Sequence, residues 1–593
     1  MSLRRADVLP ELDLPVAGDL IDAGRKLAKT HSIGPSPFLS EHGVACEVEY
    51  KQAQAAAGRI MFHAQVGYRD AEKSRRAYGE IHREITCAGF QLDRYGICLD
   101  WSMGYPAADR RGRPKGTGLI LESPEDFQRL TAAAPVAPHF GDFVIGLPGA
   151  VDNTIAALAA GATAIGNLGQ YFTFRLPHWN DDVATTAATL QALALCAAQP
   201  VDVLIHSNLD DGFAALFSDL ACSLGAVLLE RHIVEGLIGG RMGHCYGHTF
   251  SDPVARSAFQ GALTEIGGGP GTMIYGNTTA FGPDPKANYD ALSAYLRVDF
   301  AGQRAAPTGH AINPVPVTEA LRIPEMDEIV DAHLFANRLL EDSAETEDII
   351  DREVADNATA LLVEGGRRFY DSVLAGLTEA EIDTGNPFEM LLALKRVGAR
   401  QLVHLFGPGE IDPSAVGGRR ALIQACPIRE IEQQARHCLD GIGEDDTTAI
   451  RAHGFTACVA TTDVHEYGKL LLEAVLRQLD VAMIDGGVST DPGDLVATAV
   501  GGHADFVAVS TYNGIALDYL HGLDSEIQER NLSLPIFIGG KLNQIPADSN
   551  TSLPVDVSGD LQAAGAIACT RVEDMLTHLA QWAGETMSRE NGA

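Results

Sequence analysis

Basic residues are scarce in this sequence, with 44 Lys and Arg against 79 Asp and Glu, a formal net charge of −35 at pH 7. Such a surface repels a phosphate backbone, so we expect no nucleic-acid binding. Apolar runs of membrane-spanning length are also missing, and the N-terminal residues lack the apolar core of a signal peptide. We therefore expect a cytoplasmic protein that does not enter membranes.

Cysteine clusters are absent as well. The ten cysteines are scattered along the chain, and no two of them form a Cys-x-x-Cys pair. This spacing excludes a cysteine-ligated iron–sulfur centre and favours reduced thiols.

Two α/β patterns follow one another along the 593 residues. After an N-terminal arm (1–57), short apolar runs alternate with helical patterns over 58–340, and Ser123-Pro124 is typical of a helix start. Repeated strand–helix units predict a (β/α)8 TIM-type barrel, with an open doubly wound sheet as the alternative. The runs are 59–67, 90–101, 142–149, 162–169, 201–208, 226–232, 271–278 and 305–312.

The second pattern begins at 451, after a helical extension and linker at 341–450. Asp491-Pro492 is again typical of a helix start. Strand–helix repeats of this length predict a C-terminal flavodoxin-like (Rossmann-like) domain at 451–593, whose ligands bind beyond the carboxyl ends of its strands. Its expected strands are 455–461, 481–487, 505–510, 535–540 and 566–570.

The turn after the first of these strands carries Asp463, His465 and Gly468, spaced Asp-x-His-x-x-Gly. A neutral imidazole binds transition metals well, and a carboxylate on its other ring nitrogen fixes the tautomer. Glycine leaves room for a bulky flat group to approach the backbone. Two further pieces, Ser510-Thr511-Tyr512 and Gly539-Gly540, end the third and fourth strands.

Together these pieces resemble the cobalamin-binding domain of base-off/His-on enzymes, whose signature is Asp-x-His-x-x-Gly, Ser-x-Leu and Gly-Gly. Tyr512 replaces the leucine, which alters the surroundings of the nucleotide tail. The resemblance implies that His465 is the lower ligand of the cobalt and that Asp463 is its partner. It further implies that Gly468 lets the corrin approach and that Ser510 bonds the displaced benzimidazole. Gly539 and Gly540 would let the backbone approach the ribose and phosphate of the tail.

The barrel resembles the catalytic E subunit of glutamate (methylaspartate) mutase. The clearest pieces are HAINPVPVTEALRIP (310–324) and GNPFEMLLALKRVGARQLVHLFGPG (385–409), with a looser match at 166–179. This resemblance implies an adenosylcobalamin-dependent radical carbon-skeleton mutase, an isomerase, that forms a homodimer. A corrinoid methyltransferase and a non-enzymatic cobalamin sensor are the alternatives.

Most of the substrate-binding residues of that family are not kept, and of its arginine clamp only Arg94 is a candidate counterpart. Leu147-Pro148 occupies the place of an expected arginine, and Leu168 that of a glutamate. The family glutamate that contacts the adenosyl group falls near His310. We therefore expect a small polar or carboxylate substrate other than glutamate.

Polar residues expected at the carboxyl ends of the barrel strands are the candidates for contact with substrate. Asp93, Arg94, Asn167 and His310 are the catalytic candidates, and Arg94 could bind a carboxylate bidentately. His244 and His248 have metal-like spacing but lack nearby ligands in sequence, and Gly267–Gly271 is most simply a turn. The wider set is His63, Gln170, His206, Asn208, Glu230, His232, Tyr275 and Asn277.

Overall fold

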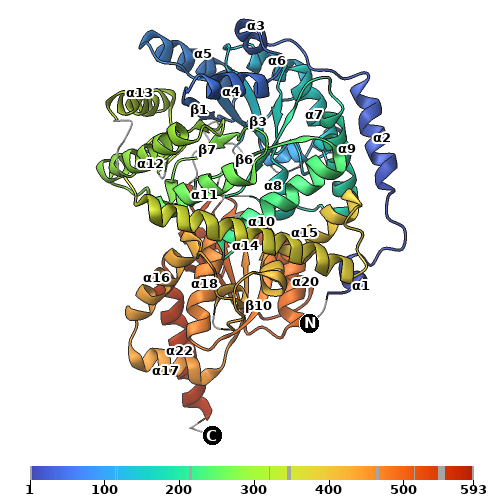
Figure 1. Cartoon of the computed structure of the whole chain (residues 1–593). Helices are drawn as coiled ribbons and strands as arrows, with labels where there is room; N and C mark the ends of the chain where they lie inside the picture. The colour runs from blue at the N-terminus through green and yellow to red at the C-terminus, as the bar shows by residue number, and fades with distance from the viewer. Residues whose placement is uncertain are drawn as a thin grey trace. The chain divides into compact units, whose positions relative to one another are not determined.

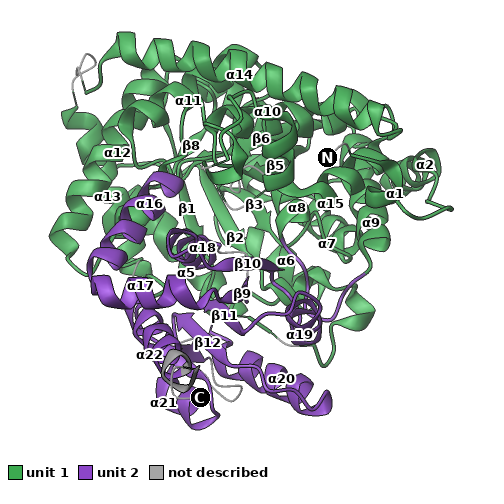
Figure 2. Cartoon of the chain, turned by 90° about the horizontal axis from the view of Figure 1, so that it is seen from below, with its two compact units in different colours: residues 1–173, 181–426 green, residues 174–180, 427–593 purple. Residues whose placement is uncertain are grey.

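The computed structural model of the chain contains two compact units (Figure 2). Unit 1 comprises residues 1–173 and 181–426, and unit 2 comprises 174–180 and 427–593. The main segment of unit 2 thus begins inside the region expected to be a helical extension and linker, and its short segment 174–180 falls within the range expected to be the barrel. The described residues are 3–113, 115–116, 118–210, 212, 217–319, 321–343, 349–413, 415–462, 466–512, 514–544 and 555–590.

Unit 1 is built on eight parallel strands in the order β6-β5-β4-β3-β2-β1-β8-β7 (Figure 1). The two edge strands are joined by backbone hydrogen bonds, Tyr275 N to Tyr246 O (2.8 Å) and Thr272 N to His244 O (3.0 Å). The sheet therefore forms a nearly closed barrel, as predicted. The strands are β1 (Met61–Val66), β2 (Arg94–Cys98), β3 (Ala137–Asp142), β4 (Ala164–Ile165), β5 (Leu204–Asn208), β6 (Arg241–Cys245), β7 (Met273–Ile274) and β8 (Ala311–Ile312).

Helices lie outside these strands. Ser123 caps α6 through a capping box with Asp126, which confirms the helix start expected there. The helices that follow the strands are α5 (Ala71–Cys87), α6 (Pro124–Thr131), α7 (Ala150–Ala159), α8 (Leu168–Thr173), α9 (Asp182–Ala197), α10 (Leu220–Arg231), α11 (Pro253–Ile266), α12 (Pro285–Ala305) and α13 (Met326–Asp342).

Segments before and after the barrel add further helices to unit 1. The early helix α2 packs against α9, and the long helix α14 packs against α10 and α11. Among the described residues, no helix combines the length and the apolar composition needed to cross a membrane. The added helices are α1 (Arg5–Val8), α2 (Ala17–Ala28), α3 (Pro37–His42), α4 (Glu47–Ala56), α14 (Arg352–Glu379) and α15 (Pro387–Phe406).

Two of the expected barrel strands are wrong. The run 226–232 lies almost entirely in α10, and the sixth strand is β6. A short apolar run does not distinguish a strand from a fully buried helix, and nearly every residue of α10 is buried. The run 142–149 is likewise mostly a buried loop after β3, because Gly146 has a φ of +95° and interrupts an extended backbone.

A layer of imidazoles fills part of the barrel interior. His63 on β1, His139 on β3 and His206 on β5 are buried, with ring centroids 6.3 Å apart for the first pair and 4.4 Å for the second. Such layers take side chains from alternate strands. Glycines make room for these rings: a Cβ at Gly96, on β2, would lie 2.7 Å from His63 Nε2, and one at Gly166, directly after β4, would lie 2.6 Å from His206 Cδ2. Burial lowers the pKa of all three histidines well below the usual value, so they are neutral.

Unit 2 contains five parallel strands in the order β10-β9-β11-β12-β15, and each of the five runs expected as strands forms one. The strands are β9 (Thr456–Thr461), β10 (Ala482–Val488), β11 (Phe506–Thr511), β12 (Ile536–Gly540) and β15 (Ile567–Cys569), with a small antiparallel pair of β13 (Asn543–Gln544) and β14 (Val555–Asp556). The helices are α16 (Cys426–Asp440), α17 (Glu444–His453), α18 (Tyr467–Gln478), α19 (Pro492–Gly501), α20 (Ala516–Glu529), α21 (Ser558–Ala563) and α22 (Val572–Glu590).

Helices cover both faces of this sheet. Along β9, Ala457 and Val459 belong to the cluster formed with α18 and α22, whereas Cys458 and Ala460 belong to the cluster formed with α19 and α20. Successive strand residues point to opposite faces, so both faces are buried. This explains why these strands are almost continuously apolar.

One buried side chain of unit 1 gives a test of stability. Neither ring nitrogen of His333, on α13, has a hydrogen-bond partner among the described residues, and the ring packs against Phe62. Burial lowers the pKa of His333 to about 3. We expect His333→Leu to raise the free energy of unfolding by about 1–3 kcal/mol at neutral pH, because it removes an unsatisfied buried polar group.

The pH dependence has a defined sign. Because the folded-state pKa lies below the unfolded value of 6.5, the unfolded chain binds more protons between pH 6.5 and about 3. The stability of the natural protein should therefore fall relative to the variant as pH decreases through this window. Denaturant unfolding of both proteins measures this, with His404→Leu, at an exposed histidine of the same unit, as the control. A variant at His333 that is less stable at neutral pH would contradict the prediction.

Candidate functional site

A buried ion pair lies at the amino-terminal end of the barrel strands. Arg94 is the first residue of β2, and its Nε donates to Glu47 Oε1 of α4 at 2.7 Å, with both side chains at most 2% exposed. Lys51, one turn along α4, lies 3.6 Å from the same carboxylate and donates to Thr272 O and Gly309 O. Burial lowers the pKa of Lys51 to about 7, although the negative charge of Glu47 acts to raise it.

Three of the four catalytic candidates lie at this end, and their expected placement at the carboxyl ends is wrong. Asp93 precedes β2 and accepts from Tyr50 Oη (2.6 Å) and Phe62 N (2.8 Å). Arg94 is paired as described, and His310 precedes β8. The sequence pattern shows that these residues lie close to a strand, but it does not show at which residue the strand begins. It therefore did not distinguish the amino-terminal end of the strand from its carboxyl end.

From Arg94 a chain of hydrogen bonds runs along the inside of the barrel. Arg94 Nη1 lies 3.3 Å from His63 Nδ1, and because arginine only donates, this nitrogen accepts. His63 Nε2 then donates to Gln65 Oε1 at 2.8 Å. Gln65 Nε2 donates to Cys98 Sγ, and Cys98 donates to Asp142 Oδ2 at 3.3 Å. Every bond points from the guanidinium towards the carboxylate; we call these five residues the polar chain.

The polar chain ends at the carboxyl ends of the strands, since Cys98 and Asp142 are the last residues of β2 and β3. Gln170 Nε2, on α8, donates to Asp142 Oδ1 at 3.2 Å. Burial raises the pKa of Asp142, and hydrogen bonds from Cys98 and Asn167 oppose that shift. Burial also raises the pKa of Cys98 well above the usual value, so the thiol keeps its proton. Asp142 is only half-buried and can accept a hydrogen bond from a bound molecule.

Asn167 is the catalytic candidate that the structure does place at this mouth. Its Oδ1 accepts from Gly169 N and Asn208 N, both at 2.9 Å, and so joins the ends of β4 and β5.

Sequence reasoning missed Gln65, Cys98 and Asp142. Asp142 could have been found as a carboxylate at the end of a strand. The run predicted as the third strand, 142–149, begins at Asp142, so this residue appeared to lie at the start of a strand instead.

The wider candidate set is dispersed. Gln170, Asn208, Tyr275 and Asn277 follow or end strands at the mouth, His63 and His206 lie inside the barrel, and Glu230 and His232 lie at the end of α10. His244 Nε2 lies 3.0 Å from Glu230 Oε2, and His248 Nδ1 lies 2.6 Å from Thr278 Oγ1. Within the described ranges, no group of three or more His, Cys, Asp or Glu residues could hold a metal ion.

A second candidate site lies at the carboxyl ends of the strands of unit 2. Asp463 and His465 lie outside the described residues; in sequence they follow β9, which ends at Thr461. Gly468 lies in the first turn of α18, and a Cβ there would lie 2.1 Å from Ser510 Oγ at the end of β11. Two motif residues that are distant in sequence are therefore in direct contact, and a side chain at 468 would displace the Ser510 hydroxyl.

The other motif residues lie beside this contact. In the pairing of β11 with β12, Ser510 is opposite Gly539 and Thr511 is opposite Gly540. Gly540 has a φ of +96°, and a Cβ there would lie 2.4 Å from Thr511 O. Tyr512 is 48% exposed, and Lys541 Nζ lies 4.2 Å from its ring centroid.

These residues fit the group that the motif implies. The edge formed by Ser510, Gly539 and Gly540 carries no side chain larger than a hydroxymethyl group, so little side-chain bulk lies beside the backbone there. Thr511 Oγ1 is buried and has no hydrogen-bond partner among the described residues. A buried hydroxyl without a partner is expected where a ligand completes the site.

The helix start expected at Asp491-Pro492 is confirmed, because α19 begins at Pro492. The Asp491 carboxylate, however, accepts from the backbone N–H of His178, at 3.0 and 3.2 Å, and not from its own helix. His178 belongs to the segment 174–180 that is part of unit 2.

No family model matches the chain.

The buried ion pair gives a direct test. We expect Glu47→Gln to lower the free energy of unfolding by about 3–5 kcal/mol, because it leaves the buried Arg94 cation without its counter-charge. Glu72→Gln, which breaks an exposed ion pair with Arg75, is the matched control and should cause no measurable loss. Equal stability of the two variants in denaturant unfolding would show that the buried pair does not hold the barrel together.

Proposed function

We propose that unit 2 binds a cobalamin with His465 as the lower cobalt ligand. We further propose that the chain is an adenosylcobalamin-dependent carbon-skeleton mutase acting on a small polar or carboxylate compound other than glutamate. The observation that carries this proposal is the contact of Gly468 with Ser510, with Gly539 in register beside it. Three separate pieces of the cobalamin signature thus meet at one edge of one sheet.

The strand order of unit 2 supports the proposal. Numbered within the unit, the order is 2-1-3-4-5, the order of flavodoxin-like sheets. In such sheets ligands bind outside the carboxyl ends of the strands, at the point where the strand order reverses. That point lies at β9 and β11, and the segment 463–465 follows β9 directly.

The residues of this edge would have distinct roles toward the cofactor. His465 would supply the imidazole and Asp463 would fix its tautomer. Ser510 Oγ would hydrogen-bond the displaced base, and Gly539 and Gly540 would let the backbone approach the tail. When bound, adenosylcobalamin supplies radical chemistry through its cobalt–carbon bond.

The polar chain would bind and orient the substrate at the mouth of the barrel. Arg94, the arginine expected to hold a substrate carboxylate, is engaged with Glu47 at the opposite end. The mouth instead presents the Asp142 carboxylate, held in place by Cys98 and Gln170. A carboxylate accepts hydrogen bonds, so a substrate with an ammonium or hydroxyl group suits this site better than one recognised by carboxylates alone.

Cobalt coordination tests the cofactor assignment. In the cobalt(II) cobalamin complex of the full chain, we expect nitrogen splitting in the electron paramagnetic resonance spectrum to change multiplicity when the protein's histidines carry ¹⁵N. His465→Ala should remove this dependence and weaken cobalamin binding, whereas His521→Ala, an exposed histidine of the same unit, should preserve both. A ¹⁵N-sensitive splitting that persists in His465→Ala would exclude the proposed ligand.

Radical formation tests the reaction class. We expect the protein loaded with adenosylcobalamin to give a coupled cobalt(II)–organic radical signal after freeze-quenching with one of several pools of amino, hydroxy and dicarboxylic acids. Methyl transfer from methylcobalamin without such a signal would favour a corrinoid methyltransferase. Cobalamin binding that changes only association of the chain would favour a sensor.

The role of Asp142 can be separated from cofactor binding. Asp142→Asn keeps the shape of the side chain but removes its charge, so we expect the apparent substrate affinity to fall roughly ten- to hundredfold. Cobalamin affinity should stay unchanged. Asp290→Asn, an exposed carboxylate of α12, is the control. An unchanged substrate dependence in Asp142→Asn would remove this residue from the substrate site.

A further inference from the structure

A basic turn lies in the loop that follows β2, at the mouth of the barrel. It carries Arg110, Arg111 and Arg113, in a chain with 44 basic against 79 acidic residues. Because β2 ends at Cys98, this loop belongs to the carboxyl end of the strands, where Asp142 also lies. A basic cluster in an acidic protein creates a local positive potential that attracts anions.

The basic turn is fixed by packing against the loop that follows β3. Gly149 N donates to Gly104 O at 2.7 Å, and a Cβ at Gly149 would lie 2.5 Å from Tyr105 O. Arg110 Nε donates to Tyr105 O at 2.9 Å, and Arg113 Cζ lies 4.9 Å from the centroid of the Tyr105 ring. Tyr105 is buried, so it holds both arginines in place.

Both of these arginines are half-buried, and neither forms an ion pair with a carboxylate among the described residues. Arg110 Nη2 donates to Asn153 Oδ1 at 2.6 Å, but its Nη1 has only the weak acceptor Met103 Sδ, at 3.8 Å. Arg113 has no hydrogen-bond acceptor in the part of the chain that the structure describes. Burial lowers the pKa of Arg110, and the charge of Asp152 opposes this shift only in part. A bound anion would supply the missing counter-charge.

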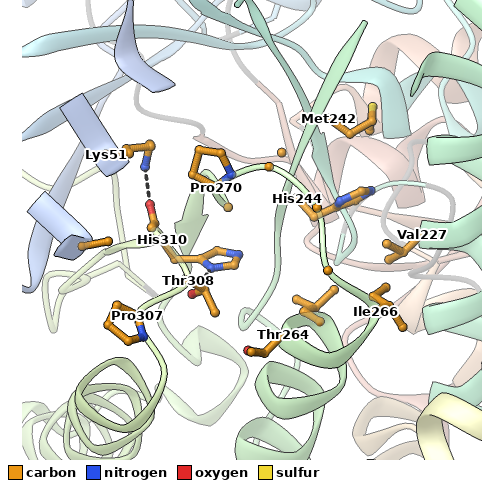
Figure 3. A pocket seen from close by; sticks show the side chains of 18 of the residues that line it. Lys51, Val227, Met242, His244, Thr264, Ile266, Pro270, Pro307, Thr308 and His310 are labelled. Atoms are coloured by element: carbon orange, nitrogen blue, oxygen red, sulfur yellow. Dashed lines mark hydrogen bonds between the residues drawn. The ribbon is translucent and has the colours of Figure 1, made fainter. Parts of the chain in front are cut away.

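Cations at the other end of the barrel are paired within the protein. Figure 3 shows a cavity of about 280 Å³ there, with Lys51 hydrogen-bonded to the backbone at its edge. Lys51 lies 3.6 Å from Glu47, and Arg231 Nε donates to Glu235 at 2.9 Å. These cations have counter-charges, in contrast to the two arginines of the basic turn.

Hydrogen bonds connect Arg110 with the carboxylate at the mouth. Asn153, which accepts from Arg110, donates through Nδ2 to Phe143 O at 3.1 Å. Phe143 directly follows Asp142, and its N–H donates to Gln170 Oε1 at 3.0 Å. Gln170 Nε2 in turn donates to Asp142 Oδ1. One network therefore positions a guanidinium and a carboxylate at the same end of the barrel.

We infer that Arg110 and Arg113 bind an anionic group of the substrate, a carboxylate or a phosphate, while Asp142 binds its amino or hydroxyl group. The planar fork of donors on arginine matches both kinds of oxyanion. The inference rests on the proposed function, because it concerns the same substrate site. It defines the substrate as a two-ended molecule, with an anionic group at one end and a hydrogen-bond donor at the other.

Calorimetric titration of the purified full chain, without and with bound hydroxocobalamin, tests the inference. The two-ended probes are β-alanine, 4-aminobutyrate, 6-aminohexanoate, 4-hydroxybutyrate and 3-aminopropylphosphonate. We expect saturable binding of at least one of them, and roughly tenfold weaker binding of the unbranched alkylamine or alcohol of the same length, which lacks the anionic group. The acids and the phosphonate distinguish a carboxylate from a phosphate.

Absence of saturable binding by every two-ended probe would overturn the inference, as would equal binding of the probes that lack the anionic group. Failure to bind hydroxocobalamin would contradict the proposed function instead. The titration without cobalamin would still measure the contribution of the arginines, so the two failures are distinguishable.

Three variants of the basic turn locate the binding. Arg113→Gln and Arg110→Gln should each weaken binding of the two-ended probes roughly tenfold or more. Arg111→Gln is the matched control, because this arginine is exposed and its charge is screened at about 0.15 M salt. Arg113 has no hydrogen bond that its replacement would break, so this variant remains informative even if Arg110→Gln fails to fold. Unchanged binding in Arg113→Gln, or equal weakening in Arg111→Gln, would overturn the assignment, and thermal unfolding verifies that each variant is folded.

Discussion

The ion pair between Glu47 and Arg94 is the constraint on which the interior of the barrel depends. A guanidinium this deeply buried needs a counter-charge, and α4 supplies it together with one hydrogen bond, from Arg94 Nε to Glu47 Oε1. Arg94 Nη2 and Glu47 Oε2 have no hydrogen-bond partner among the described residues. Because Arg94 can only donate, it fixes the tautomer of His63, which in turn fixes the orientation of Gln65 and the thiol proton of Cys98. A helix that precedes the barrel in sequence thereby determines which atoms the mouth at the opposite end presents.

Glycine shapes both units, for the same physical reason. In the barrel, glycines on the intervening strands make room for an interior layer of imidazoles. In unit 2, Gly468 allows α18 to begin against Ser510, and Gly540 allows β12 to end against Thr511. At each of these positions a methyl group would lie closer than van der Waals contact permits, so side-chain absence defines the sites as much as side-chain chemistry does.

Polar groups at the two ends of the barrel differ in what they can bind. The mouth presents a half-buried carboxylate with hydrogen-bond donors behind it, which suits a ligand that donates. At the amino-terminal end the cations are already paired within the protein, Arg94 and Lys51 with Glu47 and Arg231 with Glu235. The polar chain runs between the ends with a single direction of donation, from the buried guanidinium of Arg94 to the carboxylate of Asp142 at the mouth.

Local patterns were sufficient for the repeating strands, for the starts of α6 and α19, and for the positions of Ser510 and Gly539 at strand ends, because periodicity and capping are short-range or repetitive. The contact of Gly468 with Ser510 came only from the tertiary structure. They were insufficient for two barrel strands and for the ends at which Asp93, Arg94 and His310 lie. The length of an apolar run does not reveal where its strand begins, nor whether it is a buried helix. Only the tertiary structure brought Glu47 to Arg94 and Asp142 to Cys98, because those contacts join residues from separate elements whose burial no local pattern records.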